Sequence, residues 1–176
     1  IRELDVFSVI LPWDIPKKKI VALNPSGIVL SGGPESVTNN NTPRIPEIIF
    51  DLEIPILGIC YGMQTLAEQF GGQVTSSKTK EFGHASTIIE KSCVLFDGFD
   101  TGSSIDVWMS HGDHVSTLPD KFHLIASTSS APIAAMAHTE KHIYALQFHP
   151  EVTHTQEGNV VLKNFVLKIC SCQAQW

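Results

Sequence analysis

The chain has 176 residues, of which 43% are hydrophobic and 17% are charged, a balance that suits one globular domain with a sizeable core. Its formal charge is −6 and its only small basic cluster spans residues 17–19, so no nucleic-acid partner is expected, because phosphate binding needs a basic patch. No apolar run approaches the roughly 20 residues that span a bilayer. Four cysteines in so core-rich a chain do not indicate a disulfide framework, and a cytoplasmic protein without membrane contact is expected.

In the first 70 residues, apolar β-rich runs alternate with stretches of helical spacing. Buried parallel strands are predicted over residues 27–31 (GIVLS) and 54–59 (IPILGI), and helices over residues 43–53 and 61–70. After residue 72 the pattern changes to short strands joined by turns, followed by one amphipathic helix. These elements are expected over residues 85–90, 107–109, 122–127, 132–137 and 142–148 for the strands, and 158–170 for the helix.

This order of elements predicts an α/β fold in which a three-layer sandwich surrounds one mixed, mostly parallel sheet with a β-rich insert. No change of composition marks a boundary, so residues 1–176 are interpreted as one domain. The chain opens on IRELDVF, which has the pattern of a helix interior. We therefore expect that a first strand is missing ahead of Ile1.

The segment GICYG places Cys60 where a buried strand passes directly into a helix, with Gly58 and Gly62 on either side. This G-x-C-x-G pattern matches the nucleophile elbow of serine hydrolases, with sulfur in place of oxygen. Glycines on both sides remove the Cβ atoms that would clash at so sharp a turn. The N-terminus of the following helix favours the thiolate form of Cys60. A buried structural cysteine is the alternative, since free cysteines are often buried.

A base for this cysteine is expected at His149, because the segment QFHPE ends a strand-like run and brings an imidazole to the edge of the sheet. Glu151 lies two residues further, on the same side of extended chain, and Pro150 keeps His149 extended. A carboxylate on one ring nitrogen would leave the other nitrogen for the thiol. The alternatives are a loop histidine beside a solvent-facing glutamate, and a metal site of His149, Glu151 and His154. The spacing does not suit a metal, so none is expected.

The turn Ser31-Gly32-Gly33-Pro34 follows the first predicted strand and leaves backbone N–H groups uncovered. The N–H groups of Gly33 and Tyr61 could together form an oxyanion hole. A phosphate-binding loop fits less well, because neither G-x-x-x-x-G-K-[ST] nor G-x-G-x-x-G follows. An ordinary turn is the remaining alternative.

Four segments, GICYGMQTLAEQFGG, SGGPES, VWMSHGD and QFHPEVTHTQEG, closely resemble a class I (triad-type) glutamine amidotransferase domain, along nearly the whole chain. SGGPES and the cysteine elbow recur across that family, whereas VWMSHGD, EFGHA and HPEVTHT resemble the branch that aminates XMP to GMP. The resemblance implies no cofactor in this domain. It also implies an ATP-pyrophosphatase domain of the same polypeptide, which uses ATP and Mg, and a dimerisation domain, both outside this chain.

The resemblance assigns roles residue by residue. The nucleophile, the base and its orienting acid correspond to Cys60, His149 and Glu151. The oxyanion-hole positions, which act through backbone N–H groups, correspond to Gly33 and Tyr61. The expected contacts with the glutamine substrate are Gln64, Ser110 and His111. Without the resemblance, the first of these would be a polar residue on an exposed helix face, and residues 110–113 (SHGD) would be a polar turn.

The reaction implied by this resemblance is hydrolysis of the side-chain amide of glutamine to glutamate and ammonia through a Cys60 thioester, with ammonia passing to XMP. The adjoining domain should dock over the triad, at residues 77–84 and the SHGD turn, and the full enzyme should be a homodimer. The segment at residues 98–105 is short for the connection expected there, so we expect residues to be missing from it. Two rival interpretations stay open. One is another hydrolase with a cysteine elbow, such as a γ-glutamyl hydrolase or a peptidase, and the other is a non-catalytic docking or redox-sensing domain.

Overall fold

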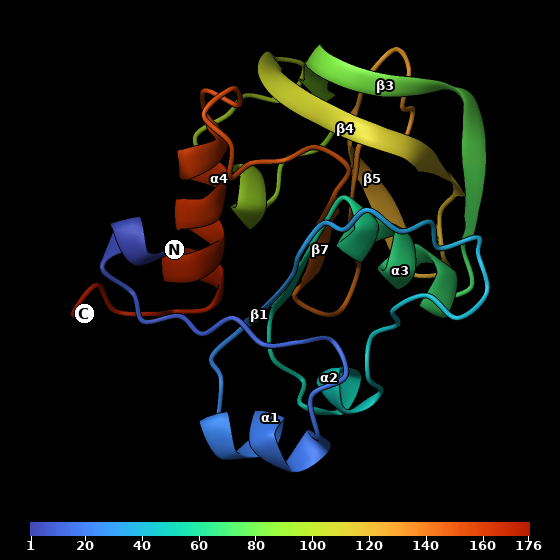
Figure 1. Ribbon diagram of the computed structural model, residues 1–176. Coiled ribbons are helices and arrows are strands. Elements are labelled where there is room, and N and C mark those ends of the chain that lie inside the picture. Colours follow the sequence, from blue (N-terminus) through green and yellow to red (C-terminus); the bar gives the residue numbers. More distant parts are fainter.

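The structure, a computed structural model, describes the backbone of residues 1–176 and the side chains of all residues except 77–80. Its centre is a sheet that has seven strands in the described chain, in the spatial order β1-β2-β7-β6-β5-β3-β4 (Figure 1). The strands are β1 (Ile28–Leu30), β2 (Ile56–Ile59), β3 (Gln73–Ile89), β4 (Ser104–Thr117), β5 (Phe122–Ser127), β6 (Ala135–His138) and β7 (Ile143–Leu146). The helices are α1 (Lys17–Leu23), α2 (Ile48–Asp51), α3 (Tyr61–Gln69) and α4 (Gly158–Lys163), which continues as a π-helical segment, Asn164–Ile169. Short 3-10 turns lie at Arg2–Leu4 and Val94–Phe96.

Helices cover both faces of this sheet. Met63 of α3 belongs to a core cluster that includes Ile56 of β2. Phe165, in the segment that continues α4, belongs to a second cluster that includes Leu57 of β2. Successive side chains of a strand point to opposite faces, so the neighbours Ile56 and Leu57 enter different clusters. The predicted three-layer α/β fold is thereby confirmed.

The balance of strand directions corrects the expectation of a mostly parallel sheet. β1 pairs with β2, and β2 with β7, in parallel. The other four pairings among the described strands, β7 with β6, β6 with β5, β5 with β3 and β3 with β4, are antiparallel. The β-rich insert therefore supplies more of the sheet than expected, and the parallel strands are confined to the part that carries the cysteine elbow.

The two long strands β3 and β4 differ most from the sequence prediction, which placed strands only at residues 85–90 and 107–109. Their pairing continues beyond Met109, with Ser110 opposite Phe82 and His111 opposite Glu81. Residues 110–113 (SHGD) therefore lie within a strand, which corrects the expectation of a polar turn. Polar residues are compatible with a strand here because the backbone groups find partners on the neighbouring strand.

The helix predicted over residues 43–53 is shorter than expected, because only Ile48–Asp51 is helical. Pro46 disfavours the helical conformation for the residue before it, which is Ile45. The backbone of Ile45 is satisfied by the side-chain amide of Gln69 instead. Its N–H donates to Oε1 at 2.8 Å, and its carbonyl accepts from Nε2 at 3.0 Å.

The four cysteines, Cys60, Cys93, Cys170 and Cys172, are all free thiols. Within the described residues, no helix combines the length and apolar character that crossing a membrane requires.

Candidate active site

Cys60 sits at the junction of β2 and α3 in a backbone conformation that is rare for a residue with a side chain. Its φ is 52° and its ψ is −107°, outside the regions that L-residues ordinarily occupy. Such strain persists only where the surroundings enforce it, and it is typical of nucleophile elbows. The predicted sharp turn at Cys60 is confirmed.

The glycines on either side of Cys60 are required by close packing. A Cβ atom on Gly62 would lie 2.2 Å from the carbonyl oxygen of Leu30, in β1. A Cβ atom on Gly58 would lie 2.7 Å from Cδ1 of Leu66 and 2.9 Å from the backbone of Gly62. The first turn of α3 therefore presses against β1 and β2, and only glycine permits that approach.

Polar groups from two other strands converge on the sulfur of Cys60. The parallel pairing extends past β2, because the N–H of Cys60 donates to the carbonyl of Leu146 at 2.7 Å. The thiol donates to the carbonyl of Ser110 at 3.5 Å, and Nε2 of Gln147 donates to Sγ at 3.8 Å. Cys60 is only 5% exposed, which alone would suit a structural cysteine. Its polar surroundings distinguish it from one.

The imidazole of His149 lies between Cys60 and Glu151. Its Nδ1 is 2.7 Å from Oε1 of Glu151. The hydrogen bond with Cys60 and that with Glu151 raise the pKa of His149 to about 10, against the opposing effect of burial. Burial by itself would raise the pKa of Glu151, but the hydrogen bond and the charge of the ring outweigh it and hold that pKa below its ordinary value. The three predicted triad residues thus lie together, with the imidazole paired to Glu151 and packed next to Cys60.

Gly32 shows how closely the imidazole and the cysteine pack. A Cβ atom at Gly32 would lie 2.9 Å from Cε1 of His149 and 3.5 Å from Cβ of Cys60. The ring therefore occupies the space that a side chain at position 32 would fill. Gly32 is therefore required for packing at the site, whereas the sequence predicted a role only for the backbone N–H of Gly33.

The backbone of His149 is fixed to β4 by a buried hydroxyl. The N–H of His149 donates to the carbonyl of Trp108 at 3.1 Å. Thr155, only 4% exposed, donates its hydroxyl to the carbonyl of His149 at 2.6 Å and accepts the N–H of Trp108 at 3.0 Å. The ring of His154 packs on Trp108 with a centroid separation of 4.5 Å. His154 therefore supports the loop, and no cluster of three metal-ligating side chains is found among the described residues.

The two predicted oxyanion-hole residues, Gly33 and Tyr61, adjoin each other. A Cβ atom on Gly33 would lie 3.8 Å from Cγ of Tyr61, at ordinary contact distance. In the described chain, neither N–H donates a hydrogen bond to another protein group. The loop that follows is tied to β4, because the hydroxyl of Ser36 donates to Oδ2 of Asp113.

Of the three residues predicted to contact glutamine, Gln64 and Ser110 belong to the hydrogen-bond network around Cys60, whereas His111 pairs with Glu81. Gln64 is 3% exposed, and its Nε2 donates to the carbonyl of Asp113 at 2.8 Å, so it does not lie on an exposed helix face. Ser110 touches the thiol through its carbonyl. His111 is turned instead toward Glu81, with 3.0 Å between Nε2 and Oε2, and its Nδ1 lies 2.9 Å from the carbonyl of Asp113. Burial lowers the pKa of His111 despite that carboxylate.

Sequence reasoning missed four residues at the site, which are Gly32, Asp113, Gln147 and Thr155. Gln147 and Thr155 lie inside the quoted motif QFHPEVTHTQEG. A signal for Gln147 existed, because the parallel register of β2 with β7 sets it beside Cys60. The contacts of Asp113 depend on the extension of β4 beyond Met109, which the sequence did not predict, and those of Thr155 depend on the approach of a distant loop to Trp108.

A strained cysteine at the end of a parallel strand, with a histidine–carboxylate pair packed next to it, is typical of enzymes with a cysteine nucleophile. The family described as glutamine amidotransferase class-I matches residues 1–169, and the chain belongs to that family. Two curated relatives are named GMP synthase [glutamine-hydrolyzing]. The protein of Hamiltonella defensa is 52% identical and that of Mannheimia succiniciproducens 50%, each over 100% of this chain. The chain spans 35% of the length of these relatives.

Solved structures agree with this assignment. A Thermoplasma acidophilum protein described as one component of a GMP synthase has a TM-score of 0.79 and 38% identity, covering 97% of this chain and 84% of that one. A glutamine amidotransferase of Thermotoga maritima has a TM-score of 0.64 and 25% identity, covering 85% of this chain and 67% of that one. The fold and the family therefore agree.

Proposed function

We propose that this chain hydrolyses the side-chain amide of glutamine to glutamate and ammonia. The observation that carries the proposal is the line of contacts from Cys60 through His149 to Glu151, with the imidazole seated against Gly32. Membership of the glutamine amidotransferase family supports the substrate.

In the first half of the proposed reaction, the thiolate of Cys60 attacks the amide carbon of glutamine. The Gly33 and Tyr61 N–H groups stabilise the negative charge that develops on the amide oxygen. Because the pKa of His149 is raised to about 10, its imidazolium holds a proton at neutral pH. That proton goes to the nitrogen as the C–N bond breaks, which releases ammonia and leaves a γ-glutamyl thioester.

In the second half, water attacks the thioester while His149 takes a proton from it. The C–S bond breaks, glutamate leaves, and the thiolate and the imidazolium are restored. Glu151 stays ionised throughout and holds the ring in one orientation.

We further propose that the ammonia serves the amination of XMP to GMP in a longer protein, because the curated relatives carry the name GMP synthase. An ATP-pyrophosphatase domain of the same polypeptide would use ATP and Mg, and this domain would need no cofactor of its own. On this proposal residues 1–176 form one glutaminase domain of a cytoplasmic homodimer.

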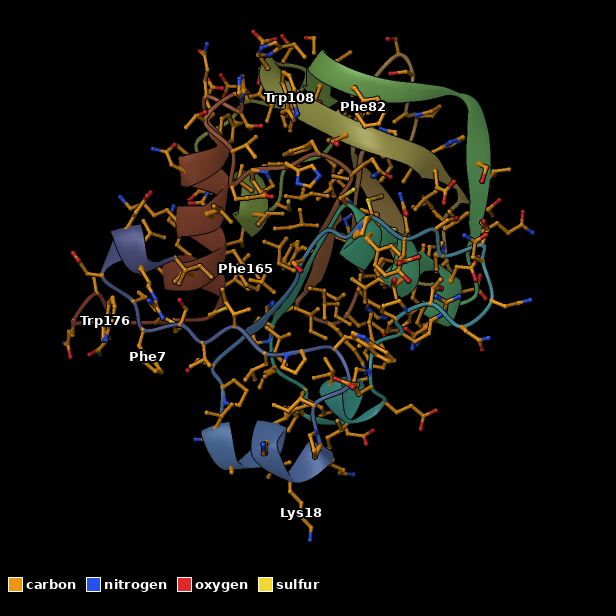
Figure 2. The ribbon with its side chains drawn as sticks, viewed as in Figure 1. Phe7, Lys18, Phe82, Trp108, Phe165 and Trp176 are labelled. Carbon is orange, nitrogen blue, oxygen red and sulfur yellow. The ribbon has the colours of Figure 1, made fainter. Side chains whose placement is uncertain are left out.

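The face that would meet the synthase domain is proposed at the β3–β4 ribbon. Of the segment predicted for it, residues 77–80 lie outside the described side chains. Phe82, which is 65% exposed, and Trp108, which pairs opposite His84, lie on these neighbouring strands (Figure 2). Trp108 also contacts the backbone of His149, so a partner seated here would lie next to the site that releases ammonia.

Glutamate release by purified chain, with Cys60→Ala and Cys93→Ala compared, tests the proposal. Cys60→Ala should abolish turnover, because no thioester can form, whereas Cys93→Ala should leave it unchanged. In the longer protein, synthesis from added ammonia should survive Cys60→Ala. Retained glutamine turnover in Cys60→Ala would disprove the assignment. Turnover of γ-glutamyl peptides in preference to free glutamine would favour another hydrolase with a cysteine elbow. Absence of any amidase activity would favour a non-catalytic docking or redox-sensing domain.

A further inference from the structure

Gln147 is a buried amide that the proposed reaction does not use. It follows β7 directly and is 0% exposed. The parallel register pairs Ile59 with Leu146, so the next residues along each strand, Cys60 and Gln147, lie side by side. Its backbone is also fixed, because its N–H donates to the carbonyl of Ala134 at 2.8 Å.

Both ends of the Gln147 side chain have partners that determine its orientation. Its Oε1 accepts a hydrogen bond from Nε2 of Gln64 at 3.3 Å, which leaves its own Nε2 to face Cys60 at 3.8 Å from Sγ. Gln64 is held in turn by the carbonyl of Asp113 at 2.8 Å. The donor group of Gln147 is therefore directed at the sulfur by a chain of hydrogen bonds, of which the two that involve Gln147 itself are buried.

The amide of Gln147 favours the ionised form of the Cys60 sulfur over the neutral thiol. A buried primary amide is costly unless its groups are paired, so a position chosen for packing alone would be apolar. A hydrogen bond to an ionised acceptor is roughly twice as strong as one between neutral groups, and low local polarity strengthens it further. An N–H directed at Sγ thus stabilises the thiolate more than the thiol.

We propose that Gln147 stabilises the thiolate of Cys60, and that Gln64 sets the orientation in which it does so. The inference deepens the proposed glutamine hydrolysis and rests on it for its catalytic meaning. It adds a second donor to the sulfur besides His149, on the side of the thiol that faces β7.

The test is the pH dependence of Cys60 alkylation by iodoacetamide, followed by peptide mapping so that the other three cysteines do not contribute. Gln147→Met has a similar volume but no N–H group. We expect the midpoint of its alkylation to move about one pH unit upward, so that at pH values below the midpoint it reacts about tenfold more slowly than the unchanged chain. Gln73→Met, at an exposed position on β3, is the matched control and should alkylate as the unchanged chain does.

A folded Gln147→Met protein that keeps the original rate and midpoint would overturn the proposal. If that variant does not fold, Gln64→Met decides. It removes the donor that orients the Gln147 amide, so the midpoint should move to higher pH, and an unmoved midpoint again overturns the proposal. Alkylation does not require glutamine, so this result is independent of the glutamate-release assay. A chain that shows the predicted alkylation profile but no glutaminase activity would refute the proposed function and leave the role of Gln147 in place.

Discussion

Replacing Gly32 by alanine should displace the catalytic imidazole without unfolding the protein. The added Cβ atom would lie 2.9 Å from Cε1 of His149, whereas ordinary contact begins at 3.4 Å, so the ring must retreat by about 0.5 Å. Cβ of Cys60 stands 3.5 Å away on the other side and leaves the methyl group little room to move. The ring is then pushed off the sulfur, because the backbone on both sides is fixed.

A displacement of about 1 Å in an active site can cost roughly a hundredfold in rate, so a shift of half that size is expected to lower kcat by about tenfold or more. The pKa of His149 should also fall, because the hydrogen bond with Cys60 is the main cause that raises it to about 10. The high-pH limb of kcat/KM should therefore move to lower pH. Glycine-to-alanine changes that do not strain the backbone stabilise proteins by about 0.4–1 kcal/mol, so a large loss of stability is not expected.

The assay for Gly32→Ala is glutamate release across pH, together with chemical denaturation. Ser31→Ala is the local control, because it removes an exposed hydroxyl and adds no atom toward the ring. A Gly32→Ala protein with kcat within about twofold of the original and an unmoved high-pH limb would refute the packing argument.

Two further variants test the supports of the imidazole. In Glu151→Gln, the hydrogen bond that helps to raise the pKa of His149 is weakened, so the imidazolium loses its proton at lower pH. The high-pH limb of kcat/KM should therefore move down, by only about one pH unit because the carboxylate is half-exposed. A limb that stays in place or moves upward contradicts this prediction. In Thr155→Val, two half-buried backbone groups lose their partner, so the free energy of unfolding should fall by about 1–2 kcal/mol and kcat should fall with it. Thr155→Ser should restore both. Equal denaturation midpoints and rates for the valine and serine variants would show that the hydroxyl does not act on the loop.

The cysteine elbow could be predicted because its signals are local. A buried run ends at Cys60 and a helical period begins at Tyr61, and those two facts place the thiol at the turn. The pairing of His149 with Glu151 was equally local, since both belong to one tripeptide, although Pro150 and Glu151 lie in a turn and not in the extended chain that was predicted.

The parts that escaped prediction depend on contacts between distant segments. Residues 110–113 were expected to turn because they are polar, yet they continue β4 because β3 supplies partners for their backbone. Gln147 lies next to Cys60 only because of the register of two parallel strands, which are distant in the sequence. Nothing in the sequence distinguishes Gly32 from other turn glycines, because the need for glycine there comes from the ring of His149, which packs where a Cβ atom would lie.

The central claim, that Cys60 is the nucleophile toward glutamine, is tested most directly by trapping. A glutamine analogue that carries a chloromethyl ketone in place of the amide would alkylate the attacking sulfur irreversibly, and peptide mapping would locate it. The account predicts a single adduct on Cys60, slowed by added glutamine and lost in Cys60→Ala. Labelling of Cys93, Cys170 or Cys172 instead, or labelling of Cys60 that glutamine does not slow, would contradict it.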